Sequence, residues 1–420
     1  MNIRLNPNEV REIPKKFGFG FCVYGDLDIS KDPKAMSIIE WVNYWGFRTE
    51  KSGVYTNIII PKSFDLSECF STTRLPFKYM DGFSPNLNKN LHVGHFSNMI
   101  IAKCFQSMGF AEESVAILGD TLEGDVLKAD ALREFKTLCK MFGYNVNYTY
   151  FASEVKLTDE LEKKLLSDGK GEYKGTKVFD LGSQKMVGKK SDGSTTYFYQ
   201  DIAFANVLCD RTMYLTGNEQ KGHFELVNKL SPKEMKHFGL GLVTVEGKKM
   251  SSRDGNVIYL KDVLSELREK FNDNKLSYNV MAGQILKSEP HKTKSVNMDT
   301  ITNVKSSSGL YLSYTAARLK SAGVEFEKTE KFHSNFLQYK YSKASWNYSP
   351  NILLDGLIEH CKQINRLYEN KDYNIREDDN VRVFFGTLLE DLELGMKKLG
   401  MFSIEEVKND SINELNEQTV

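Results

Sequence analysis

The chain of 420 residues lacks an excess of charge, because 56 lysines and arginines balance 56 aspartates and glutamates. Nucleic-acid-binding proteins often carry a basic excess, so any RNA contact must come from local basic patches. No stretch approaches the roughly 18 apolar residues of a membrane helix, and the N-terminal residues lack the apolar core of a signal peptide. We therefore expect a soluble, cytoplasmic protein without a membrane partner.

Cysteines are also scarce, and none of the six is paired in a C-x-x-C spacing. This pattern suggests neither a zinc site nor a disulfide framework, so we expect no metal site built by the protein itself. Hydrophobic residues make up 40% of the chain and charged residues 27%, which is typical of globular proteins. The length predicts two or three domains.

The middle of the chain has the pattern of a βαβ unit. A short strand over Leu75–Met80 precedes a turn-rich loop, an amphipathic helix over Phe96–Met108 and a strand over Ser114–Leu118. Gly109 can end the helix. Residues 125–175 read as lysine-rich helices, and three more strands are predicted at Thr195–Tyr199, Met213–Leu215 and Leu240–Val245.

Three regions follow from these patterns. Residues 1–75 are expected to form a short extension packed on or beside the main domain, and residues 76–290 an α/β domain with a parallel sheet. Residues 291–420 show long helical patterns and no obvious strands, which indicates a separate all-α domain.

The first segment with chemical potential is His92-Val93-Gly94-His95, at the predicted junction of loop and helix. Gly94 lets a flat ligand approach the backbone closely. The free N–H groups of the helix N-terminus favour phosphate, and the two imidazoles can donate hydrogen bonds to it. Taken alone, so short a pattern is equally consistent with no function.

The second segment is the basic run from Lys248 to Asn256, which includes Lys249, Met250, Ser251 and Ser252. A loop with cations, hydroxyls and a glycine can close over a triphosphate and neutralise the leaving pyrophosphate. In isolation, the ordinary interpretation is a solvated charged turn between strands.

Together, in this order, the two segments resemble the hallmark motifs of class I aminoacyl-tRNA synthetases, which flank the ATP site of a Rossmann-type (HUP-like) domain. The surrounding residues resemble the arginyl family. They are the run from Asp81 to His95, the run Ser194–Ala203, and Gly217-Asn218-Glu219-Gln220-Lys221-Gly222-His223-Phe224. The resemblance covers roughly residues 78–403 and implies an arginine–tRNA ligase that uses ATP.

The resemblance implies roles for individual residues. Those matched to ATP and catalysis are Lys89, His92, Gly94, His95, Lys249, Met250, Ser251 and Ser252, with His92, His95 and Lys249 as the catalytic set. Those matched to arginine are Asp81, Asn86, His95, Tyr197, Asp201 and Gln220. A guanidinium needs a carboxylate, preferably with a hydroxyl and an amide nearby. Tyr197 and Asp201 are four residues apart and would share a face of a helix.

The C-terminal helices resemble the family's anticodon-binding domain, which implies tRNA contacts at Tyr311, Tyr314 and Arg318. A helical bundle with aromatic residues in its core, and without any tRNA contact, explains the same spacing. The implied partners are tRNA(Arg), L-arginine and ATP with Mg²⁺, without protein-bound zinc, and we expect a monomer.

Three departures from the family keep other functions open. The chain is short, Thr121-Leu122-Glu123 stands where the family usually has W-G-T-Q, and Ser252 replaces the second lysine of Lys-Met-Ser-Lys. One alternative is a synthetase-derived ligase that passes activated arginine to a small molecule or peptide. Another is a catalytically silent RNA-binding or regulatory relative.

Overall fold

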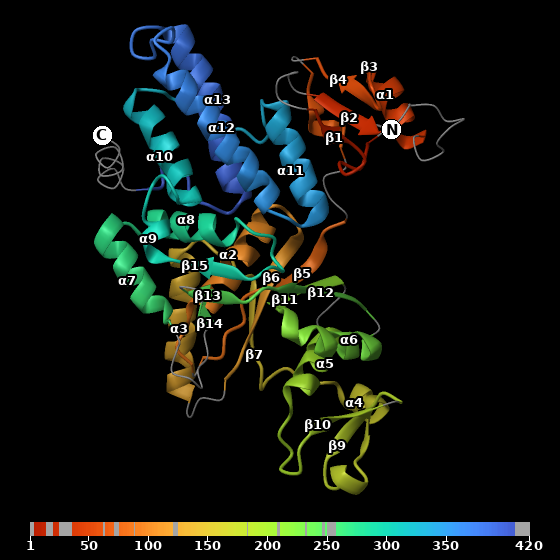
Figure 1. The fold of residues 1–420 in the computed structure, drawn as a ribbon. Coiled ribbons are helices and arrows are strands. Elements are labelled where there is room, and N and C mark those ends of the chain that lie inside the picture. The colour runs from red at the N-terminus through yellow and green to blue at the C-terminus, as the bar shows by residue number, and fades with distance from the viewer. Residues whose placement is uncertain are drawn as a thin grey trace. The chain divides into compact units, whose positions relative to one another are not determined.

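The structure is a computed structural model of the whole chain. It describes residues 4–13, 20–24, 36–61, 64–70, 75–87, 89–120, 125–182, 184–207, 211–231, 233–245, 248–249 and 258–407. These residues form two compact units, Pro76–Thr300 and the combination of Met1–Leu75 with Ile301–Val420. Each unit is described by itself (Figure 1).

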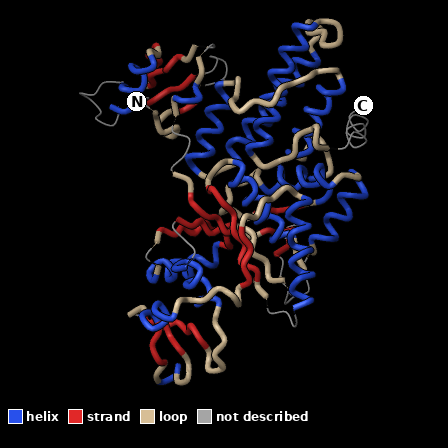
Figure 2. Tube along the Cα trace, turned by 180° about the vertical axis from the view of Figure 1, so that it is seen from behind, coloured by secondary structure: helices blue, strands red, loops and turns tan. Residues whose placement is uncertain are grey.

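The unit Pro76–Thr300, here called the α/β unit, is built on a five-stranded sheet in the order β12-β11-β5-β6-β7. All four neighbouring pairs are parallel, which confirms the predicted α/β fold with a parallel sheet. Its strands are β5 (Phe77–Asp81), β6 (Ala111–Leu118), β7 (Tyr148–Phe151), β11 (Arg211–Gly217) and β12 (Glu234–Leu240). Figure 2 shows these strands from behind.

Helices pack against this sheet. A buried apolar cluster joins α5 (Tyr197–Val207) and α6 (Lys221–Leu230) to strands β6, β11 and β12. Helix α2 (Val93–Ser107) also packs against β6 and β11. The predicted end of α2 is confirmed, because Gly109 follows its last turn with a φ of 75°, a conformation that glycine adopts without strain.

The remaining elements of the α/β unit follow β6, β7 and β11 or come after β12. A small antiparallel sheet of three strands lies between β7 and α5 in the sequence. The elements of that insertion are α4 (Asp159–Leu165), β8 (Leu166–Asp168), η4 (Gly171–Tyr173), β9 (Lys177–Asp180) and β10 (Lys185–Lys189). The others are α3 (Asp125–Met141), η5 (Asn218–Gln220), β13 (Val243–Val245), β14 (Lys248–Lys249), α7 (Leu260–Phe271), α8 (Asn274–Ile285), β15 (Lys294–Val296) and α9 (Met298–Ile301).

Several local predictions were wrong. The expected strand over Thr195–Tyr199 is instead the start of α5, because the Thr196 hydroxyl accepts a hydrogen bond from the backbone N–H of Tyr199 at 3.2 Å and begins the helix. The expected strand Leu240–Val245 is split between β12 and β13. The region 125–175, expected to be helical, includes β7 and β8.

The second unit, here called the helical unit, contains the four long C-terminal helices and a four-stranded antiparallel sheet of the N-terminal residues. The helices are α10 (Ser308–Ser321), α11 (Asn335–Asn347), α12 (Asn351–Glu369) and α13 (Asp379–Lys398). The N-terminal elements are β1 (Arg11–Glu12), β2 (Gly20–Tyr24), α1 (Met36–Trp45), β3 (Arg48–Ser52), β4 (Tyr55–Ile59) and η3 (Leu66–Glu68). The predicted C-terminal helices are confirmed, but β15 lies in the stretch after Pro290 that was expected to lack strands.

The N-terminal residues pack against α11. Tyr339 is fully buried, belongs to the same apolar cluster as Trp41 and Phe70, and donates a hydrogen bond to the carbonyl of Pro7 at 3.1 Å. Residues 1–75 were expected to pack on or beside the main α/β domain. Their described core lies within the helical unit, and their packing on or beside the α/β unit stays a prediction.

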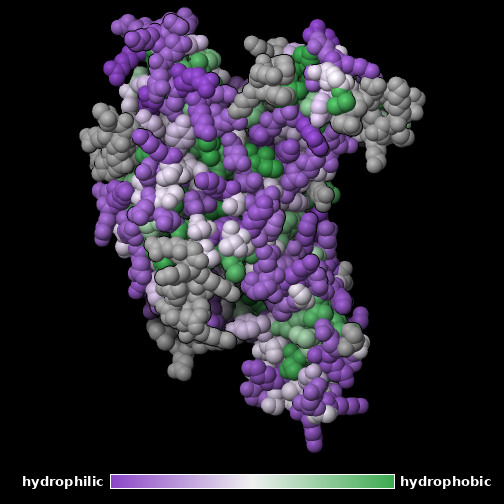
Figure 3. Space-filling model, viewed as in Figure 1, coloured by the Kyte–Doolittle hydropathy of each residue, from purple (hydrophilic) through white to green (hydrophobic). Residues whose placement is uncertain are grey.

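No helix in the described ranges is long and apolar enough to cross a membrane. The face drawn in Figure 3 is mostly hydrophilic, with hydrophobic residues in small separate groups.

Candidate active site

The segment His92–His95 forms the N-terminus of α2, directly after the loop that leaves β5. His92 is the N-cap residue, and its Nδ1 accepts a hydrogen bond from the backbone N–H of Gly94 at 3.1 Å. The Nδ1 atom of His95 accepts from the backbone N–H of His92 at 3.2 Å. This reciprocal pair is a capping box made by two imidazoles.

These hydrogen bonds determine what the histidines can donate. Because Nδ1 of each ring is an acceptor, the neutral ring carries its proton on Nε2. Burial lowers the pKa of His92, and burial together with the charges of His92 and Lys89 lowers the pKa of His95 to about 4. The two rings are stacked with centroids 3.8 Å apart. At neutral pH they are therefore neutral Nε2–H donors at a helix N-terminus.

A cavity of about 430 Å³ lies beside this segment and is called the motif cavity here. Ligand pockets of small molecules commonly have volumes of about 300–1,000 Å³. Its wall includes Asp81, His92, Gly94, His95 and Gln220, all named by the sequence analysis. The ends of β11 and β12 complete it, so the cavity lies at the carboxyl edge of the parallel sheet, where ligands of open α/β sheets bind.

Asp81 ends β5 and faces this cavity. The Ser84 hydroxyl donates to its carboxylate at 2.5 Å and accepts from the backbone N–H of Ile117 at 2.8 Å. Burial raises the pKa of Asp81 to about 7, the Ser84 hydrogen bond opposes the rise, and the negative charge of Asp201 adds to it. The two carboxylates are thus close enough to interact, and a cation between them would favour ionised Asp81.

Asp201 and Tyr197 both lie on α5, four residues apart as expected, and Tyr197 is 66% exposed. Neither is among the described residues that line the motif cavity. His223 on α6 hydrogen-bonds Asp201 through Nε2 at 2.6 Å. The His223 ring packs edge-on against Phe198, with centroids 5.4 Å apart.

No role was predicted for His223, although it is part of the Gly217–Phe224 motif. The same motif contains Glu219, which lines the motif cavity next to Gln220. The spacing of the motif was therefore the signal that pointed to both residues.

Asn86 and Lys89 lie on the loop between β5 and α2, but they line a neighbouring cavity and not the motif cavity. Asn86 forms a bridge with Gly119 at the end of β6. A side chain on Gly119 would approach the Asn86 side chain to 2.9 Å, so the close approach requires glycine.

The Lys-Met-Ser segment is described only in part. Lys248 and Lys249 form strand β14, which pairs with β13, whereas Met250, Ser251 and Ser252 lie outside the described residues. Val243, the first residue of β13, lines the motif cavity.

The chain after this segment returns to the histidine motif. Tyr259 forms a bridge with His92. The backbone N–H of Val93 donates to the carbonyl of Ile258 at 3.2 Å, and that of Leu260 donates to Leu91 at 2.9 Å. Both ends of the Lys-Met-Ser segment are thus held next to the elements that form the motif cavity.

The three residues matched to tRNA binding lie on α10 of the helical unit. Arg318 donates to the Asn365 side chain at 2.9 Å, and its guanidinium lies 4.0 Å from the ring centroid of Tyr368. Tyr311 accepts a hydrogen bond from Asn365 at 3.2 Å. In this structure the Arg318 and Tyr311 side chains connect α10 to α12.

Comparison with known proteins shows similarity over part of the chain. Residues 151–336 match the family described as tRNA synthetases class I (R), catalytic domain. The arginine–tRNA ligase of Lactobacillus johnsonii is 26% identical over 300 residues, which cover 60% of this chain and 53% of the relative. That of Oenococcus oeni is 28% identical over 297 residues, covering 57% of this chain and 52% of the relative.

Over residues 151–336 this chain is similar to the catalytic domain of class I tRNA synthetases of the arginyl type. The family match begins at residue 151 and so does not include His92–His95. The matched part spans about half the length of these curated relatives.

Solved structures of arginyl-tRNA synthetases share the fold. The Thermus thermophilus structure has a TM-score of 0.63 at 15% identity and covers 93% of this chain and 95% of that one. The Plasmodium falciparum structure has a TM-score of 0.64 at 18% identity, and covers 94% of each chain. This chain therefore has the fold of these synthetase structures.

No group of three or more metal-ligating side chains occurs among the described residues. The five cysteines in the described ranges are all free thiols.

Proposed function

We propose that this chain is an arginine–tRNA ligase, which activates arginine with ATP and transfers it to the 3′-terminal adenosine of tRNA. The observation that carries the proposal is the motif cavity. Neutral imidazole donors, a buried carboxylate and Gln220 share one cavity at the carboxyl edge of the sheet. Both anchors of the Lys-Met-Ser segment adjoin it.

In the first step, the arginine carboxylate attacks the α-phosphate of ATP and pyrophosphate leaves. No covalent enzyme intermediate is required, so positioning and charge stabilisation carry the catalysis. His92 and His95 donate their Nε2–H groups to the phosphates, and the α2 N-terminus favours their negative charge. Gly94 has no side chain to obstruct the adenosine, and Lys249 neutralises the leaving pyrophosphate.

Arginine is held at both ends. Asp201 pairs with the guanidinium, with Tyr197 and Gln220 as hydrogen-bonding partners. Asp81, Asn86 and His95 lie by the α-amino and carboxylate groups. The interaction between Asp81 and Asp201 supports this set, because two nearby carboxylates match a substrate with two positive charges.

The second step transfers the arginyl group from the adenylate to a ribose hydroxyl of the terminal adenosine. Lys89 adds positive charge near the phosphates, and Met250, Ser251 and Ser252 complete the loop over ATP. Mg²⁺ enters with the ATP phosphates. The helical unit binds tRNA(Arg) through the face that includes Tyr311, Tyr314 and Arg318. The working protein is a cytoplasmic monomer.

The direct test is arginine-dependent exchange of pyrophosphate into ATP, measured with and without total tRNA, followed by charging of tRNA with labelled arginine. The proposal predicts exchange that requires tRNA and a charged tRNA product. Exchange without tRNA would favour a ligase that uses a small acceptor. Absence of exchange and charging under both conditions would refute the enzyme function.

A further inference from the structure

Lys294 is a buried lysine at the start of β15 in the α/β unit. It is only 2% exposed, although lysine is almost never fully buried unless its charge is paired. No carboxylate in the part of the chain that the structure describes forms an ion pair with it. Burial lowers the pKa of the ammonium to about 8, so it carries its charge at neutral pH. Keeping a lone charge out of water is costly, which indicates a specific task for this side chain.

The ammonium closes the turn formed by residues 290–292, which comes shortly before β15 in the sequence. Its Nζ donates hydrogen bonds to the backbone carbonyls of Pro290 at 2.7 Å and of Lys292 at 2.9 Å. An ammonium has three donors, and two of them are used on this one turn. Lys294 therefore connects the first residue of β15 to the turn.

Gly241, which lines the motif cavity, fixes the position of this turn. Its backbone N–H donates to the carbonyl of Pro290 at 2.9 Å. A Cβ atom on Gly241 would come within 2.0 Å of the carbonyl oxygen of Lys292, so the two backbones are in close contact and only glycine fits there. A shift of the turn would therefore displace the cavity wall.

The short helix η5 provides a second support for the turn. The Asn218 side chain donates to the carbonyl of His291 at 2.9 Å, and Asn218 directly precedes Glu219 and Gln220 of the cavity wall. A Cβ atom on Gly239 would come within 2.1 Å of the Asn218 side-chain oxygen, so this contact is also close. The turn is thus held by two parts of the motif cavity.

Lys294 also holds β13, the strand that leads to Lys249. Its backbone N–H donates to the carbonyl of Leu242 at 2.8 Å, and its own carbonyl accepts a hydrogen bond from the Thr244 hydroxyl at 3.3 Å. Strand β13 lies between β15 and β14, and β14 contains Lys249. The same residue therefore links the turn to the hairpin of β13 and β14.

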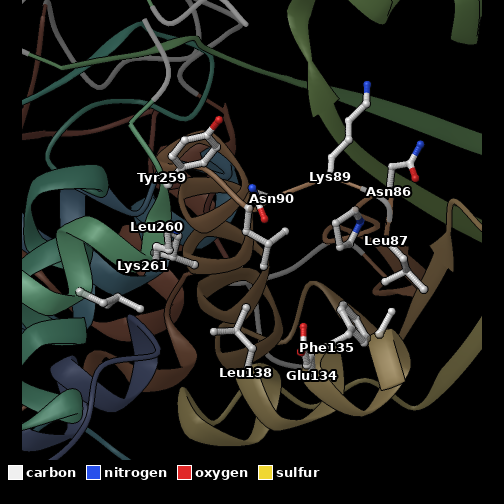
Figure 4. A pocket seen from close by; sticks show the side chains of 14 residues that line it. Asn86, Leu87, Lys89, Asn90, Glu134, Phe135, Leu138, Tyr259, Leu260 and Lys261 are labelled. Atoms are coloured by element: carbon white, nitrogen blue, oxygen red, sulfur yellow. The ribbon is translucent and has the colours of Figure 1, made fainter. Parts of the chain in front are cut away.

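The chain beyond Lys249 is anchored separately. Figure 4 shows Tyr259 next to Asn90, on the loop before α2. Tyr259 also forms a bridge with His92. Lys294 takes no part in these contacts, so its removal should change the position of Lys249 and leave this second anchor intact.

We propose that Lys294 is a positioning residue for Lys249. Its ammonium holds the turn, its backbone holds β13, and together they set the place of Lys249 relative to the motif cavity. The inference rests on the proposed function, which assigns Lys249 to the leaving pyrophosphate. A displacement of about 1 Å can lower a rate about a hundredfold even when its cause lies far from the reacting atoms, so this support matters for kcat.

Lys294→Met removes the ammonium and keeps a side chain of similar shape. It leaves no unpaired charge behind, so the urea midpoint of the α/β unit should stay close to that of the wild type. We expect kcat for the exchange of pyrophosphate into ATP to fall about tenfold to a hundredfold. The KM for arginine should change less than about twofold, because its proposed guanidinium partners Tyr197 and Asp201 lie on α5. An unchanged kcat overturns the inference.

Lys292→Met is the matched control. Lys292 lies in the same turn, but its side chain is 60% exposed and pairs with Glu289 at 3.3 Å. The substitution keeps the backbone carbonyl that accepts from Lys294, and exposed ion pairs contribute little, so kcat should equal that of the wild type. An equal loss of kcat in both variants would show that the ammonium of Lys294 has no special role.

A double-mutant cycle separates positioning from a general loss of structure. If Lys294 acts through Lys249, the double variant that combines Lys249→Ala with Lys294→Met loses no more kcat than Lys249→Ala alone. Losses that simply multiply show that the two residues act independently, and they refute the positioning role.

Hydrogen–deuterium exchange tests the structural part without catalysis. The backbone amides of β13 should exchange at least about tenfold faster in Lys294→Met than in the wild type, whereas those of α2 should not change. Equal protection of β13 in both chains refutes the inference, whatever the activity of the wild type. If β13 loses protection in the variant while the wild type catalyses no exchange of pyrophosphate, Lys294 still positions the hairpin and the proposed function alone is refuted.

Discussion

Replacing Asp81 by asparagine is expected to stabilise the α/β unit at high pH. Burial raises the pKa of this carboxyl from 3.8 to about 7, so between those values the folded state binds more protons than the unfolded state. Stability must then fall as the pH rises through this window. A pKa difference of about three corresponds to a loss of about 4 kcal/mol in the free energy of unfolding. This loss is complete only above pH 7.

An asparagine side chain carries no charge, so the Asp81→Asn variant does not lose this stability as the pH rises. Its free energy of unfolding should exceed that of the wild type by up to about 4 kcal/mol at pH 8, and by about 1 kcal/mol or less at pH 4. An amide can still accept the hydrogen bond from Ser84. The same change should weaken arginine binding, because the carboxylate proposed beside the α-amino group is gone.

The assay must follow the α/β unit alone. The tryptophans Trp41, Trp45 and Trp346 all belong to the helical unit, so their fluorescence reports on the wrong part of the chain. Cys104 on α2 is fully buried and becomes reactive only when the α/β unit opens. Urea-dependent labelling of the Cys104 peptide at pH 4, 6 and 8 therefore measures the relevant stability. A gain that is the same at every pH would refute the reasoning.

Three further variants test the proposed machinery. Asp201→Ala should raise the KM for arginine at least about a hundredfold while ATP binding stays unchanged; charging at a normal KM contradicts the pocket. His223→Leu should raise that KM about tenfold with little effect on kcat, and His223→Asn, which keeps a donor, should recover part of it. Equal effects of the two substitutions would indicate that His223 acts only through packing. Lys249→Ala should lower kcat more than it raises the KM for ATP, and an unchanged kcat would exclude Lys249 from the chemistry.

The Asp81 prediction depends on a property that no sequence motif contains. Asp81 could be placed in the site from the spacing of the arginyl-like run. Its high pKa required the fold, because Asp201 is 120 positions away and reaches it only when α5 packs against the parallel sheet. The same holds for the His223–Asp201 hydrogen bond between α5 and α6.

Predictions from short local sequence patterns were wrong where tertiary contacts favoured a different structure. Thr195–Tyr199 is rich in β-branched and aromatic residues, which favours a strand, yet the Thr196 hydroxyl caps a helix there. The N-terminal residues contain no motif that predicts which part of the chain they pack against. Only the packing of Phe21 and Trp41 around Tyr339 of α11 places them in the helical unit.

The sequence alone predicted the class of chemistry. The prediction of two phosphate-binding segments in a fixed order, with an arginyl-like run between strand and helix, requires only local residue types and spacing, and these are visible in one chain. The tertiary structure decided how those residues act. The hydrogen bonds at the α2 N-terminus select the Nε2–H form of both histidines, and the chain after the Lys-Met-Ser segment is tied to His92. It also separated Asn86 and Lys89 into a second cavity, because residues that are adjacent along a loop can face opposite sides of it.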